Sequence, residues 1–288
     1  MEYKNNKKDI GTVGFFHRND NKEAILWAKK ISNWIKINYP KIKITGSKPQ
    51  VLIALGGDGS ILEAARKYEN NSLSSGPIII GLNLGHIGFL ASIREPKKFL
   101  PDLKRFFDGK YVVSERIMIK ASVRRKGKIV FESNVLNEVV IQNLLGISEI
   151  DVRIESHPLQ RIKGTGVLVA TATGSTAYNL SAHGPIIMPQ MECFIINEIL
   201  DHNIPTPSII VDSNKKISMR VVFFRNRGIL NLSNKKSVDM VLVSDGEKIF
   251  PLKIGDVILA RRSPQCVRFA ELEEHYFFKS LQEKFAFK

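Results

Sequence analysis

The sequence contains only two cysteines, Cys193 and Cys266, in a chain of 288 residues. They do not form a CxxC pair, and no histidine motif lies near them. The sequence therefore predicts neither a disulfide framework nor a zinc site, and a reducing compartment fits this cysteine content. Because 43% of the residues are hydrophobic, a buried core is feasible without such crosslinks.

Long apolar runs are also lacking. No run approaches the roughly 18 residues that a membrane-spanning helix needs. The opening residues Met1-Glu2-Tyr3-Lys4 lack the apolar stretch of a signal peptide. We therefore expect a soluble, cytoplasmic protein without a membrane partner.

Acidic residues are scarce relative to basic ones, with 28 Asp and Glu against 43 Lys and Arg, a formal net charge of +15. A nucleic-acid partner would suit this balance, and so would polyanionic small substrates. The basic residues are scattered in pairs, from Lys7-Lys8 to Arg261-Arg262, without one block or an aromatic ladder. We therefore expect a solvated basic surface rather than nucleic-acid binding.

Two uninterrupted apolar runs, residues 51–55 and 77–81, lie in the first third of the chain and lead into glycines. Such runs are typical of strands buried on both faces, as in parallel sheets. A short apolar run at residues 10–16 predicts a first strand. Residues 22–37 carry apolar side chains at helical spacing, and residues 60–68 are compatible with a second helix. Together these segments predict the βαβ units of an open α/β sheet.

Short β-rich segments follow from about residue 116, several of them separated by turn residues such as Lys126-Gly127 and Asp245-Gly246. Residues 271–288 return to near-helical spacing and are expected to pack back on the first domain. The sequence thus predicts an open, Rossmann-like α/β domain over residues 1–115, a mostly β domain over residues 116–263, and a returning tail over residues 264–288.

A glycine-rich segment, Gly56-Gly57-Asp58-Gly59, lies directly between a buried strand and a helix. Glycines there let the main chain approach a phosphate closely. The helix that follows offers free N–H groups and its positive dipole end to an anion. A carboxylate in this place would handle a proton, a magnesium ion or a hydroxyl rather than the phosphate itself. Taken alone, the segment is also explained by a tight strand-to-helix turn.

A second glycine loop, residues 81–90, contains Asn83 and follows the other buried strand. Two parallel strands that end in glycine loops bring both loops to the carboxyl edge of one sheet, where ligands of open α/β folds bind. His86 in this loop and His183 further along lack metal-ligand spacing. We expect them to contact phosphate or backbone rather than a metal.

Two further motifs lie in the β-rich part. The LNE motif at residues 136–138 places an amide beside a carboxylate, which suits an adenine edge and a ribose diol. Residues 164–185 lead from a strand through a loop of hydroxyl residues and glycine to a probable helix start. There Ser175 and Thr176 are candidate caps, and Tyr178 could stack on a base or a nicotinamide ring. Capping alone explains the hydroxyl groups but not the whole dense run.

These four motifs, in this order, resemble the NAD kinase family: GGDG, NxGxxGFL, LNE, and TxTGSTAY ending in Gly-Pro. The resemblance covers roughly residues 50–190, with a weaker tail at residues 245–247. Lipid kinases and phosphofructokinases also carry a GGDG-type loop, whereas the GSTAY segment is far more particular to NAD kinases.

The resemblance implies an enzyme that transfers the γ-phosphoryl group of ATP to the 2′-hydroxyl of the adenosine ribose of NAD. It further implies that the substrate lies between two domains, that a divalent cation such as Mg²⁺ takes part, and that the chain forms a homo-oligomer, either a dimer or a tetramer.

Residue roles follow from the resemblance by position. Asp58 would be the base that accepts the proton of the ribose 2′-hydroxyl. The other implied positions are Gly56, Gly57 and Asn83 for phosphate, Asn137 and Glu138 for the adenosine part of NAD, and Gly59, Lys163, Thr165, Thr176, Ala177, Tyr178, Ser181 and Glu247 for substrate or nucleotide contacts.

Two departures from the family pattern bear on specificity. Thr165 stands where the family commonly has an aspartate near the nicotinamide, so discrimination between cofactors is expected to differ. The stretch 191–207, usually proline-rich, is altered, and His202 within it is a candidate without an assigned role.

Two other functions stay open at this point. A lipid or diacylglycerol-type kinase would share the GGDG loop, but it needs an apolar acceptor cleft and leaves the GSTAY segment unexplained. A non-catalytic protein that binds NAD or nucleic acid would use the fold as a sensor, and the intact Asp58 argues against it. A coupled assay with ATP, NAD and magnesium discriminates among the three.

Overall fold

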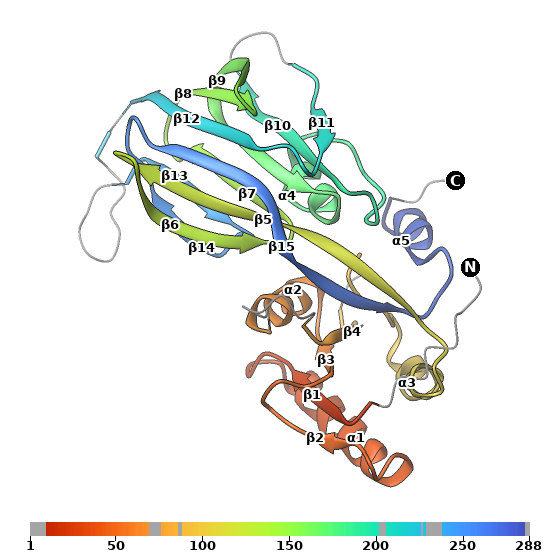
Figure 1. Cartoon of the computed structure of the whole chain (residues 1–288). Coiled ribbons are helices and arrows are strands. Elements are labelled where there is room, and N and C mark those ends of the chain that lie inside the picture. Colours follow the sequence, from red (N-terminus) through yellow and green to blue (C-terminus); the bar gives the residue numbers. More distant parts are fainter. Residues whose placement is uncertain are drawn as a thin grey trace. The chain divides into compact units, whose positions relative to one another are not determined.

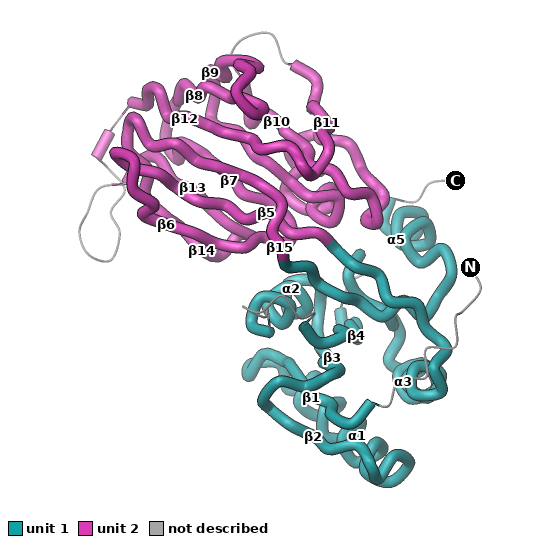
Figure 2. The backbone as a smooth tube through the Cα atoms, in the orientation of Figure 1, with its two compact units in different colours: residues 1–116, 265–288 teal, residues 117–264 magenta. Residues whose placement is uncertain are grey.

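The computed structural model describes residues 10–68, 76–85, 88–201, 206–225, 227–228 and 238–285. The chain divides into two compact units, Met1–Arg116 with Gln265–Lys288, and Ile117–Pro264 (Figure 2). It leaves the first unit within β5 (Val112–Arg125) and returns to it within β15 (Val257–Glu271) (Figure 1). His86 and His202 lie outside the described residues.

The first unit is built on a parallel sheet. Its strands follow the order β2 (Lys43–Ile44), β1 (Thr12–Phe16), β3 (Val51–Leu55) and β4 (Ile78–Leu82), and the last part of β15 pairs with β4. Every residue of β3 and β4 is buried, which is why both strands are apolar without alternation. The predicted open α/β sheet is therefore confirmed.

Within its described residues, the first unit has four α-helices, α1 (Lys22–Asn38), α2 (Asp58–Lys67), α3 (Phe99–Phe107) and α5 (Tyr276–Phe285), with a short 3₁₀ helix η1 (Pro96–Lys98) before α3. Helix α1 begins where the Asn21 side chain accepts a hydrogen bond from the Ala24 N–H at 3.0 Å. The buried faces of α1 and α3 join the strands in one apolar core. Each large apolar side chain fully buried there contributes about 1.5–3 kcal/mol.

Helix α2 begins earlier than the sequence predicts. Gly57 is its N-cap residue, so Asp58 and Gly59 belong to the first turn of the helix rather than to the loop before it. Gly57 is extended and has no side chain that could accept a hydrogen bond from the backbone N–H groups of this first turn.

The second unit is mostly β, and its strand pairs are antiparallel. In chain order, its described residues form β6 (Lys128–Val135), β7 (Glu138–Asn143), β8 (Ser148–Ile154), β9 (His157–Thr171), the 3₁₀ helix η2 (Thr173–Thr176), α4 (Tyr178–Ser181), β10 (Cys193–Asp201), β11 (Ile209–Asp212), β12 (Ile217–Phe224), β13 (Met240–Ser244) and β14 (Lys248–Pro251). Parts of β5 and β15 also belong to this unit. Strand β9 pairs with β7, β8 and β10, and it is therefore central to the unit. The mostly β character of this part of the chain is confirmed.

The Lys-Gly and Asp-Gly pairs that the sequence predicts as turns form two hairpin turns in the second unit. Lys126 and Gly127 have φ of 49° and 80°, and Asp245 and Gly246 have φ of 48° and 70°. Positive φ at both central positions matches the right-handed twist of the paired strands. Both turns therefore connect neighbouring antiparallel strands directly, β5 to β6 and β13 to β14.

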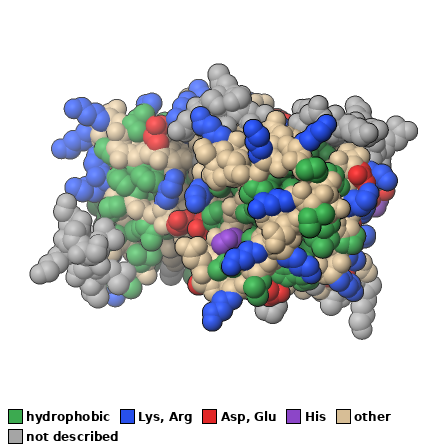
Figure 3. All heavy atoms as spheres, turned by 90° about the horizontal axis from the view of Figure 1, so that it is seen from below, with side chains coloured by type: hydrophobic (Ala, Val, Ile, Leu, Met, Phe, Trp, Pro, Cys, Tyr) green, Lys and Arg blue, Asp and Glu red, His purple; other side chains and the backbone are tan. Residues whose placement is uncertain are grey.

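None of the described helices is long and apolar enough to cross a membrane. Figure 3 shows one face of the molecule, on which lysine and arginine side chains are dispersed among hydrophobic and uncharged polar ones. The positive charge on this face is spread out, as the scattered basic pairs of the sequence indicate.

Candidate active site

The first unit has a candidate site at the carboxyl edge of its parallel sheet. Because β3 and β4 are paired in parallel, the chain leaves both strands at this edge, and Gly56 N–H donates to Leu82 O at 3.0 Å. Gly56 has φ of 143°, and a Cβ there would lie 2.7 Å from Cβ of Ser60. A glycine is therefore required for the tight connection from β3 to α2.

The carboxylate of Asp58 is held by the second glycine loop. Phe89 N–H donates to Oδ2 at 2.7 Å, and Leu90 N–H donates to Oδ1 at 3.2 Å. Gly88 leaves the space for it, since a Cβ on that residue would lie 2.0 Å from Asp58 Oδ1. Two hydrogen bonds fix the orientation of the carboxylate, and its oxygens keep lone pairs for a further proton or hydroxyl.

Asn83 and Gly59 take different places at this edge. Asn83 is buried, and its side-chain oxygen accepts a hydrogen bond from Gly85 N–H at 2.9 Å, so it shapes the second loop. Gly59 faces Arg18, because a Cβ on the glycine would lie 3.8 Å from an Arg18 Nη atom. Asp58, Gly59, Gly56, Gly57 and Asn83 are thus all placed around the two loops.

Arg18 is a neighbour that the sequence did not single out. It follows β1, the third strand that ends at this edge, and its Nε donates to Glu63 Oε2 of α2 at 2.9 Å. The ion pair is exposed, so it contributes little to stability. The guanidinium nevertheless adds a positive charge beside the first turn of α2.

The second unit has a polar cluster of its own, which centres on Glu138. This first residue of β7 is only 5% exposed, and its Oε2 has no hydrogen-bond partner among the described residues. Burial first, and the nearby Asp245 second, raise the pKa of Glu138 to about 8, against the effect of a hydrogen bond from the Tyr178 backbone. Near neutral pH this carboxyl group is largely protonated and can donate as well as accept a hydrogen bond.

Asp245 holds the LNE motif in place. Its carboxylate accepts hydrogen bonds from Leu136 N–H at 2.9 Å and from Asn137 N–H at 2.7 Å, and its own N–H donates to Glu138 O at 3.0 Å. The sequence identified Asp245 only as a turn residue in the tail of the resemblance. Glu247, the position expected to contact the dinucleotide, lies exposed just beyond the turn, and its N–H donates to Ser244 O at 3.1 Å.

The other side of the LNE motif is formed by the GSTAY segment. Asn137 O accepts a hydrogen bond from Thr171 N–H at 2.8 Å. A Cβ on Gly174 would lie 2.2 Å from the same oxygen, so the chain passes closely enough that only glycine fits. Asn137 is therefore fixed through its backbone on both sides.

Ser175 is not a helix cap, which corrects that expectation. It lies within η2, and its hydroxyl donates to Ile187 O at 3.1 Å and accepts from Ile187 N–H at 3.0 Å. The buried Asn179 amide donates to Ser175 O at 3.3 Å and to Pro185 O at 3.0 Å. A Cβ on Gly184 would lie 2.1 Å from Asn179 Oδ1. These contacts hold the start and end of the segment together.

Thr176 is not a cap either, because its hydroxyl bonds to Thr173 O at 3.4 Å inside the same 3₁₀ helix. Thr176 and Ala177 are half-buried, whereas Tyr178 is 38% exposed and Ser181 is exposed. The Tyr178 hydroxyl lies 3.5 Å from Gln142 Oε1 on β7. The expected lining positions of this segment are thus at least partly exposed to solvent.

Lys163 and Thr165 lie further along β9. Glu138 pairs with Ala170, so Thr165 lies five residues away along the strand, about 17 Å. Lys163 Nζ lies 3.7 Å from Glu149 Oε1, and Thr165 O accepts a hydrogen bond from Ser148 Oγ at 3.4 Å. The structure therefore places these two residues apart from the Glu138 cluster.

Comparison with known proteins identifies the family. The model of the ATP-NAD kinase N-terminal domain matches residues 42–111, and that of the ATP-NAD kinase C-terminal domain matches residues 136–272. The NAD kinase of Geobacter metallireducens is 33% identical over 234 residues, which cover 81% of this chain and 77% of that protein. The NAD kinase of Syntrophotalea carbinolica is 28% identical over 293 residues, covering 94% and 97%.

Solved structures share the fold. Yeast NADH kinase in complex with NADH has a TM-score of 0.84 at 18% identity, covering 98% of this chain and 89% of its own. An NAD kinase from Archaeoglobus fulgidus in complex with ATP has a TM-score of 0.68 at 21% identity, covering 95% and 97%. Together with the matched domains and the identity to curated relatives, the GGDG, LNE and GSTAY segments place this chain in the NAD kinase family.

Proposed function

We infer that this chain transfers the γ-phosphoryl group of ATP to the 2′-hydroxyl of the adenosine ribose of NAD, which yields NADP and ADP. Family membership supports the reaction. The observation that carries the residue roles is the Asp58 carboxylate, oriented by the N–H groups of Phe89 and Leu90 at the carboxyl edge of the sheet. Ligands of open α/β folds bind at this edge.

Phosphoryl transfer requires positioning and neutralisation of charge more than covalent chemistry by the protein. We propose that Asp58 accepts the proton of the ribose 2′-hydroxyl as that oxygen forms its bond to the γ-phosphorus and the bond to the leaving ADP oxygen breaks. A well-placed general base contributes roughly 10²- to 10⁴-fold to the rate. The two backbone hydrogen bonds supply the fixed orientation that such a base needs.

The phosphates of ATP would bind at Gly56, Gly57 and the first turn of α2, where backbone N–H groups and the helix dipole favour anions. Arg18 adds a positive charge beside this turn. No three His, Cys, Asp or Glu side chains of the described residues are placed to hold a metal. Mg²⁺ would bind mainly through the phosphates of ATP, whose charge it would neutralise.

The adenosine part of NAD would bind at Asn137 and Glu138. The unpartnered Oε2 of Glu138 offers a hydrogen bond to a ribose hydroxyl, and burial makes an unsatisfied group at this position costly without a ligand. Thr176, Ala177, Tyr178 and Ser181 are the accessible positions nearby, and Lys163, Thr165 and Glu247 would contact more distant parts of the dinucleotide.

We also propose that the chain works as a homo-oligomer in the cytoplasm. The family resemblance implies the oligomer, and two free cysteines fit a reducing compartment. Light scattering on the purified protein tests the first proposal, since a monomeric mass would contradict it.

A coupled assay tests the function. Purified protein is incubated with ATP, NAD and Mg²⁺, and the NADP formed is measured with an NADP-specific dehydrogenase. Controls omit ATP, replace it with polyphosphate, or replace NAD with NADH or diacylglycerol. Formation of NADP that depends on ATP is expected; phosphorylation of diacylglycerol without NADP would favour the lipid kinase, and a folded protein without either product would favour a sensor.

A further inference from the structure

Phe89 connects the C-terminal helix to the carboxylate of Asp58. Its backbone N–H donates to Asp58 Oδ2 at 2.7 Å. Its ring, 6% exposed, lies with its centroid 5.9 Å from that of Phe277 and 6.4 Å from that of Phe285, both on α5. Lys284 Nζ lies 4.9 Å from the centroid of the same ring. One residue therefore contacts the proposed base on one side and α5 on the other.

Helix α5 is fixed at both ends by Arg94, which follows the same loop. Arg94 Nη2 donates to Tyr276 O at 2.6 Å in the first turn of the helix, and Nη1 donates to Glu283 Oε2 at 2.9 Å near its end. The Arg94 side chain is largely buried, whereas Glu283 is 48% exposed, so the hydrogen bond to Tyr276 O is the better shielded of the two. The loop and the helix are thus bound to each other at two points besides the Phe89 ring.

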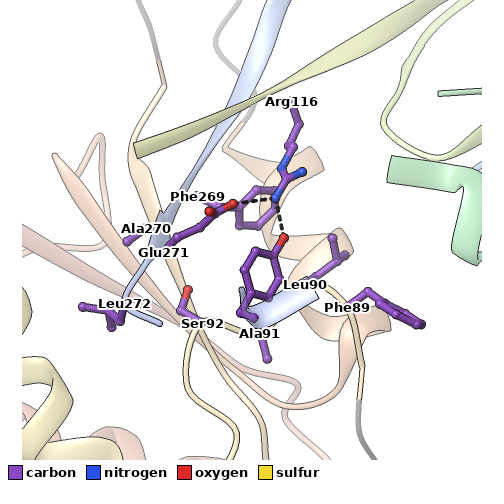
Figure 4. A pocket seen from close by; sticks show the side chains of 10 residues that line it. Phe89, Leu90, Ala91, Ser92, Arg116, Phe269, Ala270, Glu271 and Leu272 are labelled. Atoms are coloured by element: carbon purple, nitrogen blue, oxygen red, sulfur yellow. Dashed lines mark hydrogen bonds and ion pairs between the residues drawn. The ribbon is translucent and has the colours of Figure 1, made fainter. Parts of the chain in front are cut away.

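Arg116 of β5 also binds the start of α5. Arg116, whose side chain is 3% exposed, donates from Nη2 to Glu271 Oε1 at 2.8 Å and to the Tyr276 hydroxyl at 2.5 Å (Figure 4). Loop residues 89–92 and Tyr276 line a cavity of about 10 Å³, room for about one water molecule. The loop therefore has little free space on the side that faces the helix.

We propose that α5 is a positioning element for the catalytic carboxylate. Packing of Phe277 and Phe285 on the Phe89 ring holds the loop so that the Phe89 and Leu90 N–H groups keep Asp58 oriented toward the acceptor hydroxyl. Phe89 and Phe277 are positioning residues that touch no reacting atom. The proposal rests on the role of Asp58 as the base.

The first measurement compares two phenylalanines of α5. Phe277→Ala removes the buried ring that contacts Phe89, whereas Phe278→Ala removes a neighbouring ring that is 50% exposed. Misplacement of a catalytic group by about 1 Å costs up to roughly 100-fold. We expect Phe277→Ala to lower kcat by roughly 10- to 100-fold, with KM for ATP and NAD changed less than about threefold. Phe278→Ala should stay close to wild type, and Phe277→Leu should recover most of the lost kcat.

The second measurement separates positioning from general destabilisation. Phe277→Ala is combined with Asp58→Asn, and kcat is corrected for the folded fraction at the assay temperature. If the helix acts through Asp58, Phe277→Ala causes little further loss once the carboxylate is absent. An equal fold-loss in both backgrounds would overturn the proposal.

Two outcomes keep the tests distinguishable. Near-normal turnover of Asp58→Asn alone would refute the proposed base, whatever Phe277→Ala does. If Phe277→Ala unfolds at the assay temperature, Phe89→Ala serves instead, because it keeps the N–H that binds Asp58 and removes the ring. Wild-type kcat in a folded Phe89→Ala variant would also overturn the positioning role.

Discussion

The carboxyl group of Glu138 is buried beside the carboxylate of Asp245, and burial first and that neighbouring charge second raise the pKa of Glu138 to about 8. Asp245 is itself engaged by the N–H groups of Leu136 and Asn137. Asp245 therefore holds the backbone of the LNE motif, whereas Glu138 keeps an oxygen for a ligand.

This pair predicts a pH-dependent stability. Between its ordinary pKa of 4.5 and about 8, Glu138 keeps a proton in the folded state that the unfolded chain releases. The stability that Glu138 contributes to the fold is fully present below pH 4.5 and is lost as the pH rises through about 8. The unfolding free energy of wild type, relative to Glu138→Gln, should fall by up to about 1.4 kcal/mol per pH unit in this window. Urea titrations at several pH values measure it, and parallel curves for the two proteins would contradict the assignment.

The prediction for Asp58 concerns catalysis rather than binding. Asp58→Asn keeps the shape of the side chain and one oxygen for the loop N–H groups, but it removes the proton acceptor. We expect kcat to fall by at least roughly 100-fold while the KM for NAD changes by a few-fold. Steady-state kinetics with both substrates decide it. An equal loss in NAD binding would instead make Asp58 a ligand-holding residue.

Arg18 should act on ATP. Its guanidinium lies beside Gly59 in the first turn of α2, where the phosphates are proposed to bind, and its ion pair with Glu63 is exposed. Arg18→Ala should raise the KM for ATP by roughly 10-fold, about 1.4 kcal/mol, and leave the KM for NAD within about twofold. Glu63→Ala is the matched control, since it removes the partner and keeps the cation. Equal effects of the two variants would show that only the ion pair matters.

Local patterns were sufficient to predict the sheet and the place of Asp58 at its carboxyl edge. Five consecutive apolar residues in β3 are buried on both faces, and Gly56 is where the chain turns into α2. The Asp-Gly pair at residues 245–246 likewise predicted a turn, and the structure has one there. In each case the physical cause lies within a few neighbouring residues.

Contacts between distant parts of the sequence could not be predicted in this way. Asp245 is 108 positions from Asn137, so nothing in its own turn indicates that it binds the LNE backbone. Ser175 has the composition of a cap, yet its hydroxyl bonds to Ile187, which only the folded loop brings near. Likewise, the apolar spacing of α5 predicts a helix that packs back on the first domain, but not that its partner there is Phe89.

The last prediction concerns Thr165, where the family resemblance leads us to expect an aspartate. A carboxylate near the nicotinamide would attract the positively charged ring of NAD more than the neutral ring of NADH, most strongly in a partly desolvated place. Thr165 is half-buried on β9, and it supplies no charge. The nearby cation of Lys163 is already paired with Glu149 at 3.7 Å, so a new carboxylate at position 165 would not simply be neutralised by it.

Thr165→Asp should therefore shift the ratio of kcat/KM for NAD and NADH toward NAD by roughly tenfold, about 1.4 kcal/mol. Thr165→Asn is the matched control, because it has nearly the same size as aspartate and no charge. The shift should weaken as salt is added if attraction across partly solvated space causes it. An unchanged ratio in a folded Thr165→Asp variant would remove this residue from nicotinamide discrimination. A shift shared by Thr165→Asn would assign the effect to side-chain shape rather than to charge.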